Sequence, residues 1–208
     1  MPKDRYLTVK QSGEAEITVK RSRFIATVKP VLTEEEAVAF INELKQKYWD
    51  ARHNVYAYIT RDNNIMRYSD DGEPAGTAGV PVLDCLKKEG LTDVLVVVTR
   101  YFGGVLLGTG GLVHAYSAAA KAGIDAAVRT EMVLCKKVTL SCAYTLWGKI
   151  QNELSKFDLR SLSPEYSDIV KIPVYVPVSD YERLCAALTE ATNANISFEE
   201  GEEIYFSF

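Results

Sequence analysis

The feature that most constrains the fold is a strand, a loop and a helix in direct succession. Residues 94–98 read VLVVV, and a continuous apolar run of this kind is typical of a strand buried on both faces. Residues 100–111 contain five glycines, and residues 112–129 are rich in alanine, which favours a helix that packs closely. This succession predicts an α/β arrangement around one buried strand.

Periodicity predicts the other elements of the first half. Thr33 followed by Glu36 is a capping-box pattern, and apolar residues from Ala37 to Tyr48 recur with helical spacing. A second, short helix is expected at 81–88. Alternating or β-branched segments predict strands at 6–9, 17–28, 55–60 and 65–68, the second of them interrupted by the polar residues 20–23.

The second half has a different rhythm. Strands are expected at 137–143, 159–163, 169–178 and 196–206, and helices at 146–157 and 179–192, the latter capped by Ser179. The order βαββαβ is that of a ferredoxin-like α+β sandwich. We therefore expect two domains, residues 1–134 and 135–208, with their junction at 132–136.

Charge restricts the way in which this chain can meet nucleic acid. The formal net charge is −4; residues 1–134 carry 17 basic and 17 acidic residues, whereas residues 135–208 carry 7 and 11. Proteins that bind nucleic acid through bulk charge are usually basic, so any such contact must come from a local patch.

Targeting signals and metal ligands are not expected. No apolar stretch approaches the roughly 20 residues that span a bilayer, and the charged residues 1–10 do not resemble a signal peptide, so we expect a cytoplasmic protein without membrane contact. The four cysteines form no CxxC pair and only two histidines are present, which excludes a zinc site built on paired ligands. We interpret the cysteines as small buried residues and expect neither metal nor cofactor.

The glycine-rich loop is the first candidate binding site. A glycine-rich turn that leads into a helix presents unpaired N–H groups to an anion, and Arg100 leaves the buried strand at the same edge. Thr109 could cap the helix or donate its hydroxyl to a phosphate. The spacing matches neither a P-loop nor a dinucleotide fingerprint, which needs Gly or Ala where Val113 stands. The alternative is that the glycines only shape turns and allow close packing.

A second loop, residues 69–79, combines acids with glycines. Asp70, Asp71 and Glu73 are candidates for acid–base chemistry or for a cation, although turn acids more often accept local N–H groups. His53 is a candidate for catalysis, for nucleic-acid contact or for a hydrogen bond to a loop acid, and no Ser or Cys nucleophile is paired with it by motif. His114 lies near the glycine-rich loop, and we interpret it as structural.

Basic and aromatic side chains form a third pattern. They could make a surface for single-stranded or structured RNA from Arg21, Arg23, Arg52, Arg67, Arg100, Phe24, Tyr68, Tyr101 and Phe102. The alternative is that these arginines pair with the equal number of acids in this half. Charge arithmetic does not separate the two interpretations.

Several long motifs together resemble the IMPACT/YigZ family in its bacterial two-domain type. They are residues 22–26 (SRFIA), His53-Asn54-x-x-Ala57-Tyr58, residues 69–79, residues 100–104 (RYFGG) and residues 107–116 (LGTGGLVHAY). The resemblance covers essentially the whole chain. It departs from the family at His114, where relatives commonly have Arg or Lys, and this weakens a phosphate-binding role for that face of the helix.

The resemblance implies a fold for each half and a role in translation. The first half would be a ribosomal-protein domain-2-like two-layer sandwich, and the second a ferredoxin-like domain similar to the last domain of elongation factor G. Eukaryotic relatives regulate translation initiation through protein contacts. Nucleic-acid binding is implied mainly by the fold, which is an argument by analogy.

The leading hypothesis is a non-enzymatic protein that binds RNA or a ribosome-associated factor and modulates translation. The expected binding residues are Arg23, His53, Asn54, Arg67, Arg100, Tyr101, Phe102, Gly103, Gly104, Gly108, Thr109 and Gly110. One alternative is an enzyme that acts on a phosphorylated small molecule through His53, Asp70, Asp71 and Glu73, which predicts a deep pocket. Another is a protein-interaction module, which predicts an exposed apolar patch. Each requires the two glycine-bearing loops to meet at one solvent-facing edge.

Overall fold

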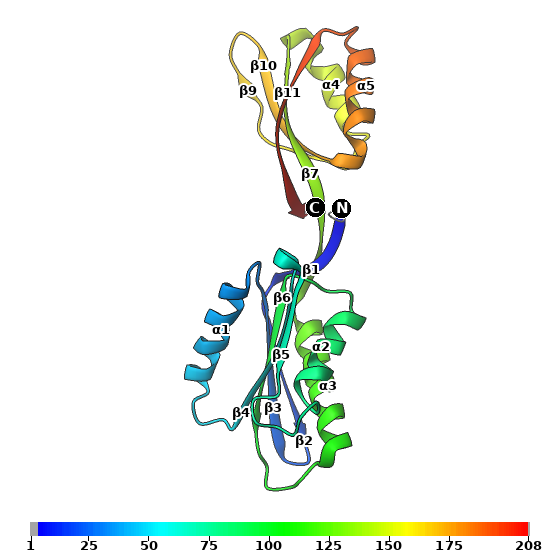
Figure 1. Ribbon diagram of the computed structural model, residues 1–208. Helices are drawn as coiled ribbons and strands as arrows, with labels where there is room; N and C mark the ends of the chain where they lie inside the picture. The colour runs from blue at the N-terminus through cyan, green and yellow to red at the C-terminus, as the bar shows by residue number, and fades with distance from the viewer. Residues whose placement is uncertain (1–3, 208) are drawn as a thin grey trace. The chain divides into compact units, whose positions relative to one another are not determined.

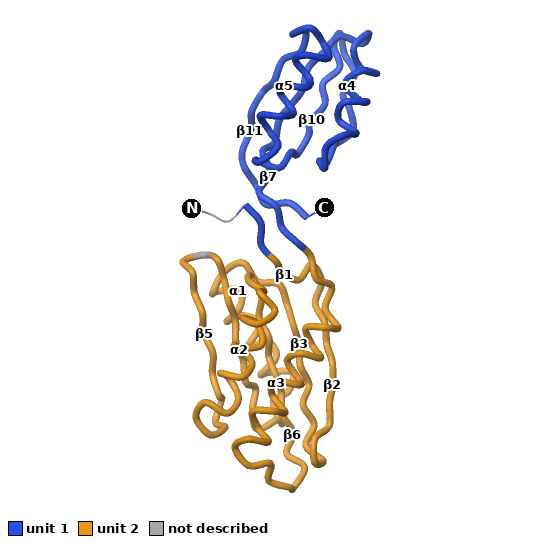
Figure 2. The backbone as a smooth tube through the Cα atoms, turned by 90° about the vertical axis from the view of Figure 1, so that its right-hand side faces the viewer, with its two compact units in different colours: residues 1–6, 131–208 blue, residues 7–130 orange. Residues whose placement is uncertain are grey.

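The chain divides into two compact units. The computed structural model describes residues 4–207, without the side chain of Asp62. Residues 7–130 form what we call the N-terminal unit, and residues 1–6 with 131–208 form the C-terminal unit (Figure 2). The expected boundary after residue 134 differs from this division because β7 (Val128–Cys142) is one continuous strand through the expected junction at 132–136. β1 (Arg5–Gln11) pairs with β7, and the division between the units falls within β1, after Tyr6.

The N-terminal unit is built on a five-stranded antiparallel sheet. Its strand order is β2-β3-β6-β4-β5 (Figure 1). The strands are β2 (Gly13–Val19), β3 (Ser22–Pro30), β4 (His53–Thr60), β5 (Ile65–Ser69) and β6 (Val94–Tyr101), and the 3-10 turn η1 (Asp62–Asn64) joins β4 to β5. β6 lies at the centre of the sheet and is buried, as its apolar run predicts.

Helices cover both faces of this sheet. α1 (Glu34–Lys47) packs on one face, where it meets Leu95 and Val97 of β6. α2 (Gly79–Lys88) and α3 (Gly108–Ala126) pack on the other face, where they meet Val96 and Val98 (Figure 1). The apolar run of β6 is therefore continuous because alternate side chains enter two different cores. α1 adds a third layer to the expected two-layer sandwich.

Some local predictions for this unit differ from the structure. The expected strand 17–28 is a hairpin, because Lys20 and Arg21 adopt φ angles of 45° and 68° and reverse the chain between β2 and β3. α3 begins at Gly108 rather than at residue 112, and its N-cap residue is Leu107. Thr109 therefore lies within the first turn and does not cap the helix.

The C-terminal unit has the βαββαβ order of a ferredoxin-like domain. After β7 come the turn η2 (Tyr144–Leu146), α4 (Trp147–Leu154), the short strands β8 (Arg160–Ser161) and β9 (Glu165–Tyr166), β10 (Val170–Pro177), the turn η3 (Val178–Asp180), α5 (Tyr181–Ala191) and β11 (Ile196–Ser207). β7 lies between β10 and β11, and β8 and β9 pair with the other edge of β10, all antiparallel. The mixed α+β fold class is thus confirmed.

The C-terminal unit has one apolar core between its sheet and its helices, as the apolar spacing of the sequence predicts. Leu140 and Ile172 from the sheet pack with Leu184 and Leu188 from α5 in one apolar core. The expected cap Ser179 lies in η3, and Asp180 is the N-cap residue of α5.

The cysteines of the two units are mostly buried. Cys85, Cys135 and Cys142 are buried, whereas Cys185 is half-buried. No helix within residues 4–207 is long and apolar enough to cross a membrane.

Candidate functional site

The two glycine-bearing loops meet at one end of the N-terminal unit. The start of β4 lies beside the end of β6, with His53 opposite Arg100, and Tyr101 lies opposite Arg23 at the start of β3. The acidic loop (residues 69–79) and the glycine-rich loop (residues 100–111) extend from this end and line a partly open pocket of about 400 Å³. Its lining residues are Arg52, His53, Glu73, Pro74, Arg100, Phe102, Leu106, Leu107, Gly108, Thr109 and Leu112.

Asp70 closes the acidic loop on itself. One carboxylate oxygen accepts hydrogen bonds from the N–H groups of Ala78 and Gly79 at 3.0 and 2.8 Å, and the other accepts from Gly76 at 2.8 Å. Two of these donors lie at the start of α2, where a helix cannot satisfy its own N–H groups. Asp70 therefore has the structural role that turn acids favour.

Asp71 connects the acidic loop to the start of β4. Its carboxylate accepts from the backbone N–H of Asn54 at 2.7 Å and from Nζ of Lys45 at 2.8 Å. Its carbonyl oxygen lies 2.8 Å from Nδ1 of His53, and because a carbonyl only accepts, Nδ1 carries the hydrogen. The other ring nitrogen, Nε2, is 3.8 Å from Oε1 of Glu73, too far for a hydrogen bond. His53 thus enters the pocket wall in a fixed orientation.

Glu73, Arg100 and Tyr116 form a buried cluster behind this wall. Oε1 of Glu73 accepts from Nη1 of Arg100 at 2.5 Å and from the hydroxyl of Tyr116 at 2.9 Å. Arg100 is only 5% exposed, so its guanidinium is engaged by Glu73 rather than presented to solvent as a phosphate contact would require. Burial raises the pKa of Tyr116, and the charge of Glu73 raises it further, which keeps the phenol protonated as a donor.

The path of the glycine-rich loop requires glycine at two positions, one that lies against the β2–β3 turn and one that adopts a positive φ. A Cβ at Gly103 would lie 2.1 Å from the backbone of Arg21, so only glycine lets the loop pass the β2–β3 turn. The N–H of Gly103 donates to the Ser22 hydroxyl at 3.2 Å. Gly104 follows with a φ of 82°, a region that favours glycine. The loop is thereby held against the hairpin.

The pocket also contains the start of α3. In the described structure no side chain caps this helix and its first turn contains no acid. Gly108 and Thr109 line the pocket, and both are exposed. Because the first N–H groups of a helix lack partners and the helix dipole is positive here, this side of the pocket favours an anion.

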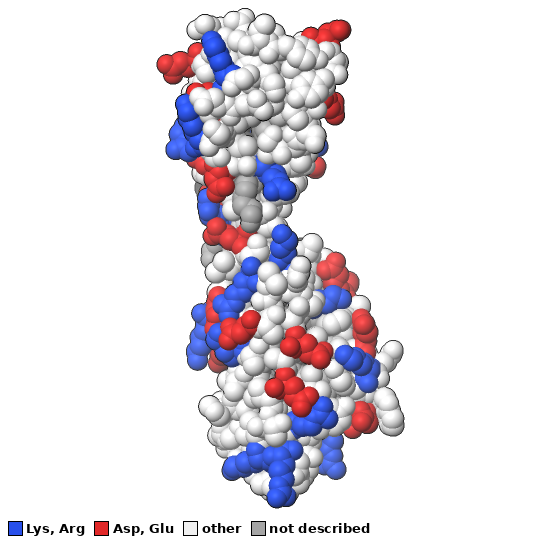
Figure 3. All heavy atoms as spheres, turned by 180° about the vertical axis from the view of Figure 1, so that it is seen from behind, with Lys and Arg blue, Asp and Glu red and all other residues white. Residues whose placement is uncertain are grey.

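Basic side chains without acidic partners lie at the same end of the unit, and one of them, Arg52, lines the pocket. Lys20 and Arg21 lie in the β2–β3 turn and Arg52 directly precedes β4; all three are exposed. Within the described part of the chain, none of them takes part in a salt bridge. Figure 3 shows Lys and Arg side chains gathered at the lower end of this unit, where Figure 1 draws the β2–β3 turn and the loop before α3.

Aromatic and apolar side chains are exposed at the same end. Trp49, Phe102 and Leu106 are 82, 41 and 83% exposed. Trp49 directly precedes Asp50, whose carboxylate accepts from the hydroxyl of Tyr101 at 2.8 Å. A surface with this composition suits a ligand that carries both negative charge and flat apolar groups.

The other expected binding residues have different positions. Arg23 is exposed but donates two hydrogen bonds to Glu16, at 3.0 and 2.8 Å. Asn54 is buried and its side-chain oxygen accepts from Thr99, which is a structural contact. Arg67 lies farther along the sheet, opposite Tyr58, with its Nε 3.6 Å from Glu34. Arg67 therefore does not belong to the pocket.

Some side chains at this site were not predicted from sequence. Tyr116 is a bulky aromatic residue among the alanines of α3, and its hydroxyl at a position that faces the core is a signal for a buried hydrogen bond. Trp49 and Leu106 lie in polar or glycine-rich segments, where an apolar residue is unexpected. His114 is exposed on α3 and does not line the pocket. Among the described side chains, no group of three or more His, Cys, Asp or Glu residues could hold a metal ion.

Comparison with known proteins covers both units. The family model of the Impact N-terminal domain matches residues 20–124, and the model of a domain of unknown function (DUF1949) matches residues 140–195. "IMPACT family member YvyE" of Bacillus subtilis is 43% identical over 96% of this chain and 93% of its own length. "IMPACT family member YigZ" of Escherichia coli is 32% identical over 89% and 92%. A solved structure, "Crystal structure of an hypothetical protein", shares 30% identity with a TM-score of 0.62 over 96% and 98% of the two chains.

Proposed function

The chain belongs to the IMPACT family, and from this premise we propose that it is a non-enzymatic RNA-binding protein that acts in translation. The RNA-binding surface is the pocket-bearing end of the N-terminal unit. The observation that carries the proposal is the presence of unpaired basic groups and exposed aromatic rings at one end of the sheet. Lys20, Arg21 and Arg52 supply the charge, and Trp49 and Phe102 supply the rings.

These two kinds of side chain serve different parts of a nucleic acid. Lysine and arginine neutralise phosphates without regard to sequence. Aromatic rings stack on unpaired bases, and each stacked base contributes about 1–3 kcal/mol. Unpaired bases are more accessible in single-stranded or looped RNA than in a duplex, so the proposal favours such RNA.

Three acids at this end are paired with cations, whereas Asp50 and Asp70 accept hydrogen bonds from uncharged groups, the Tyr101 hydroxyl and backbone N–H groups. Asp71, Glu73 and Glu16 are already engaged by Lys45, Arg100 and Arg23. The unpaired cations therefore remain available although the net charge of the chain is −4. This is the local patch that the charge balance requires of any nucleic-acid contact.

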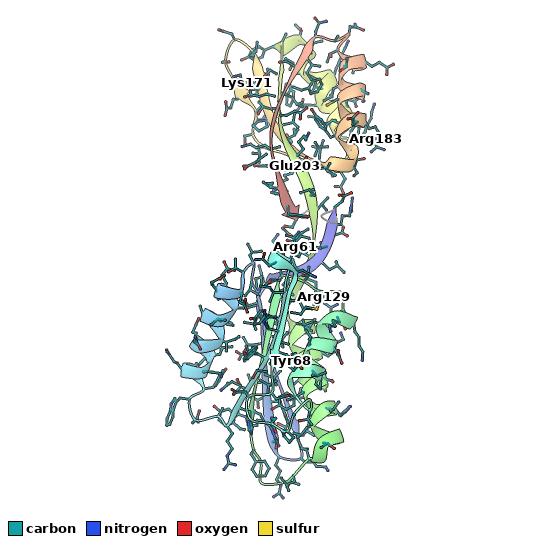
Figure 4. The ribbon with its side chains drawn as sticks, in the orientation of Figure 1. Arg61, Tyr68, Arg129, Lys171, Arg183 and Glu203 are labelled. Carbon is teal, nitrogen blue, oxygen red and sulfur yellow. The ribbon has the colours of Figure 1, made fainter. Side chains whose placement is uncertain are left out.

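A salt titration of RNA binding tests the surface. We expect Arg21→Gln and Arg52→Gln each to weaken binding of a short single-stranded RNA and to reduce the salt slope by about one unit, because each removes one phosphate contact. Lys171→Gln is the matched control, since Lys171 is an exposed cation on β10 in the other unit (Figure 4). An unchanged slope in both arginine variants contradicts the proposal.

The translational role has its own test. We expect the native protein to co-sediment with ribosomal fractions, and RNase treatment to release it. The Arg21→Gln/Arg52→Gln double variant should remain in the supernatant. Co-sedimentation that survives RNase indicates recognition of a protein instead.

One observation favours a second candidate, an enzyme that acts on a phosphorylated small molecule. His53 lines the pocket, and its Nε2 lies 3.8 Å from the buried Glu73 carboxylate, which is an arrangement suited to proton transfer. Release of p-nitrophenol from p-nitrophenyl phosphate by the native protein, and its loss in His53→Gln, would support the enzyme. Equal release by both proteins contradicts it.

A further inference from the structure

We propose that the pocket of about 400 Å³ is a subsite for a single nucleotide of the bound strand, an inference that rests on the proposed RNA binding. The phosphate of this nucleotide lies at the start of α3, and its base enters the apolar part of the pocket beside Phe102. The exposed Lys20 and Arg21, which do not line the pocket, hold the neighbouring phosphates. The subsite thus adds recognition of one base to a surface that otherwise senses charge.

The first argument concerns the phosphate. The start of α3 has no side-chain cap, no acid in its first turn, and two exposed residues, Gly108 and Thr109, in the pocket lining. A second observation concerns the pocket wall rather than the helix. Nε of Arg100, a residue that lines the pocket, is a buried side-chain atom that lacks a hydrogen-bond partner among the described residues. An unpaired buried donor is costly, so the wall favours a ligand that brings acceptor atoms, while the phosphate itself meets the start of α3.

The second argument concerns the base. The pocket has an apolar lining to which Pro74, Leu107 and Leu112 contribute, and such a lining would gain nothing from a bare phosphate ion. Phe102 is 41% exposed while the guanidinium of Arg100 lies 5.6 Å from its ring centre. The ring is therefore held by a buried contact but still offers surface for a stacked base. The volume lies within the range of about 300–1,000 Å³ that is usual for small-molecule sites.

The third argument concerns recognition of the base edge. His53 is oriented by the carbonyl of Asp71, and its Nε2 has no hydrogen bond to the nearest carboxylate, that of Glu73. Glu73 is itself fixed by Arg100 and Tyr116. A preorganised polar group in an apolar pocket gives specificity, because a base that leaves it unpaired binds less well.

The test changes one charge in the pocket with no change of shape. Thr109→Asp places a carboxylate in the first turn of α3, and Thr109→Asn is its neutral, nearly isosteric control. Thr109 is exposed and an acid in the first turn stabilises a helix, so both variants should fold. We expect Thr109→Asp to bind both a short single-stranded RNA and adenosine 5′-monophosphate about tenfold more weakly than Thr109→Asn. Inorganic phosphate and adenosine, as separate probes, should each bind more weakly than the nucleotide.

The two histidines of the chain report where the nucleotide binds, because one lines the pocket and the other does not. His53 lines the pocket, whereas His114 is exposed on α3 outside the pocket lining. We expect adenosine 5′-monophosphate to shift the imidazole NMR signals of His53 and to leave those of His114 in place. Equal shifts of both histidines overturn the subsite.

The outcomes separate this inference from the proposed function. If the wild-type protein binds RNA but Thr109→Asp and Thr109→Asn bind it equally well, the subsite is wrong and the RNA-binding surface stands. If the wild-type protein binds no RNA, the proposed function fails and the inference fails with it. If adenosine 5′-monophosphate binds with the expected charge sensitivity but RNA does not, the pocket serves a free nucleotide and the strand subsite is overturned.

Discussion

The N-terminal and C-terminal units differ most in what they bury. The N-terminal unit encloses charged and amide side chains, among them Glu73, Asp93, Arg100 and Asn54. In the described part of the C-terminal unit the buried side chains are apolar apart from Thr192. Its ion pairs, such as Lys136–Glu200 and Arg183–Asp180, lie at the surface.

This difference teaches where the molecule is specialised. A buried charge is unfavourable unless it is paired and hydrogen-bonded, so a core built only for stability avoids it. The N-terminal unit accepts that cost at both ends of β6, for Glu73 and Arg100 beside the pocket and for Asp93, which pairs with Arg61, at the other end. The C-terminal unit has no comparable cluster among its described residues, and its core is explained by packing alone.

The largest expected effect comes from breaking the buried pair. Arg100→Met leaves the Glu73 carboxylate buried without its cation, and the loss of one partner from a buried pair destabilises a protein by about 3–5 kcal/mol. Arg183→Met, which breaks the exposed pair with Asp180, should change the free energy of unfolding by about 1 kcal/mol or less. Hydrogen exchange of β6 and β10 amides measures the two units separately.

The double variant Arg100→Met/Glu73→Gln is the control for this comparison. It removes both charges and keeps a hydrogen-bonding group for Tyr116, so it should recover much of the lost stability. If Arg100→Met and Arg183→Met destabilise their units equally, the buried cluster has no special weight and the contrast between the units fails.

An intermediate effect on the free energy of unfolding is expected from replacing glycines by alanine. Gly103→Ala forces a Cβ to within 2.1 Å of the Arg21 backbone, and overpacking of this kind costs about 1–3 kcal/mol. Gly148→Ala in α4 meets no atom within 4 Å and should stabilise its helix by up to about 1 kcal/mol. Urea unfolding of each variant gives the sign.

Gly110→Ala provides a control within the N-terminal unit. Its Cβ also meets nothing within 4 Å, so it should stabilise α3 although it lies near the same loop. Destabilisation by Gly110→Ala and not by Gly103→Ala would show that the close contact of loop and hairpin does not determine the stability of this end.

The smallest expected effect is on the pH dependence of stability. A hydrogen bond from Arg129 holds the pKa of Glu89 below its ordinary value of 4.5, and the charges of Arg129 and Lys121 act in the same direction. Because the folded pKa is the lower one, the stabilisation is present above about pH 4.5 and is lost as the pH falls through the folded value. Glu89→Gln should therefore lower the urea midpoint slightly at neutral pH. At a pH below the folded pKa of Glu89 the substitution should leave the midpoint unchanged. In the C-terminal unit, Glu200→Gln should show the same sign, since Lys136 and Tyr181 lower the pKa of Glu200. A Glu89→Gln midpoint equal to that of the wild type at neutral pH contradicts the assignment.

The local sequence was sufficient to predict helices and strands where buried apolar residues recur with a regular period. The run at 94–98 predicted the buried strand β6, and the apolar spacing from Ala37 to Tyr48 predicted α1. The interruption at residues 20–23 was visible in the sequence, but the hairpin turn was not, because Lys20 and Arg21 adopt positive φ angles that their residue types do not indicate. The start of α3 was missed because glycines in its first turn read as loop.

The sequence by itself determined the two α+β halves, the family motifs and the set of residue types at the candidate site, because periodicity and motif order are local properties. Only the tertiary structure decided which of those residues are available. Arg100 is separated from Glu73 by 27 positions, and the pairing of the two in a buried site depends on the β4–β6 register and on the acidic loop. Arg21 and Arg52 stay unpaired for the same reason: pairing depends on which acids the folded chain brings near, and charge alone does not specify that.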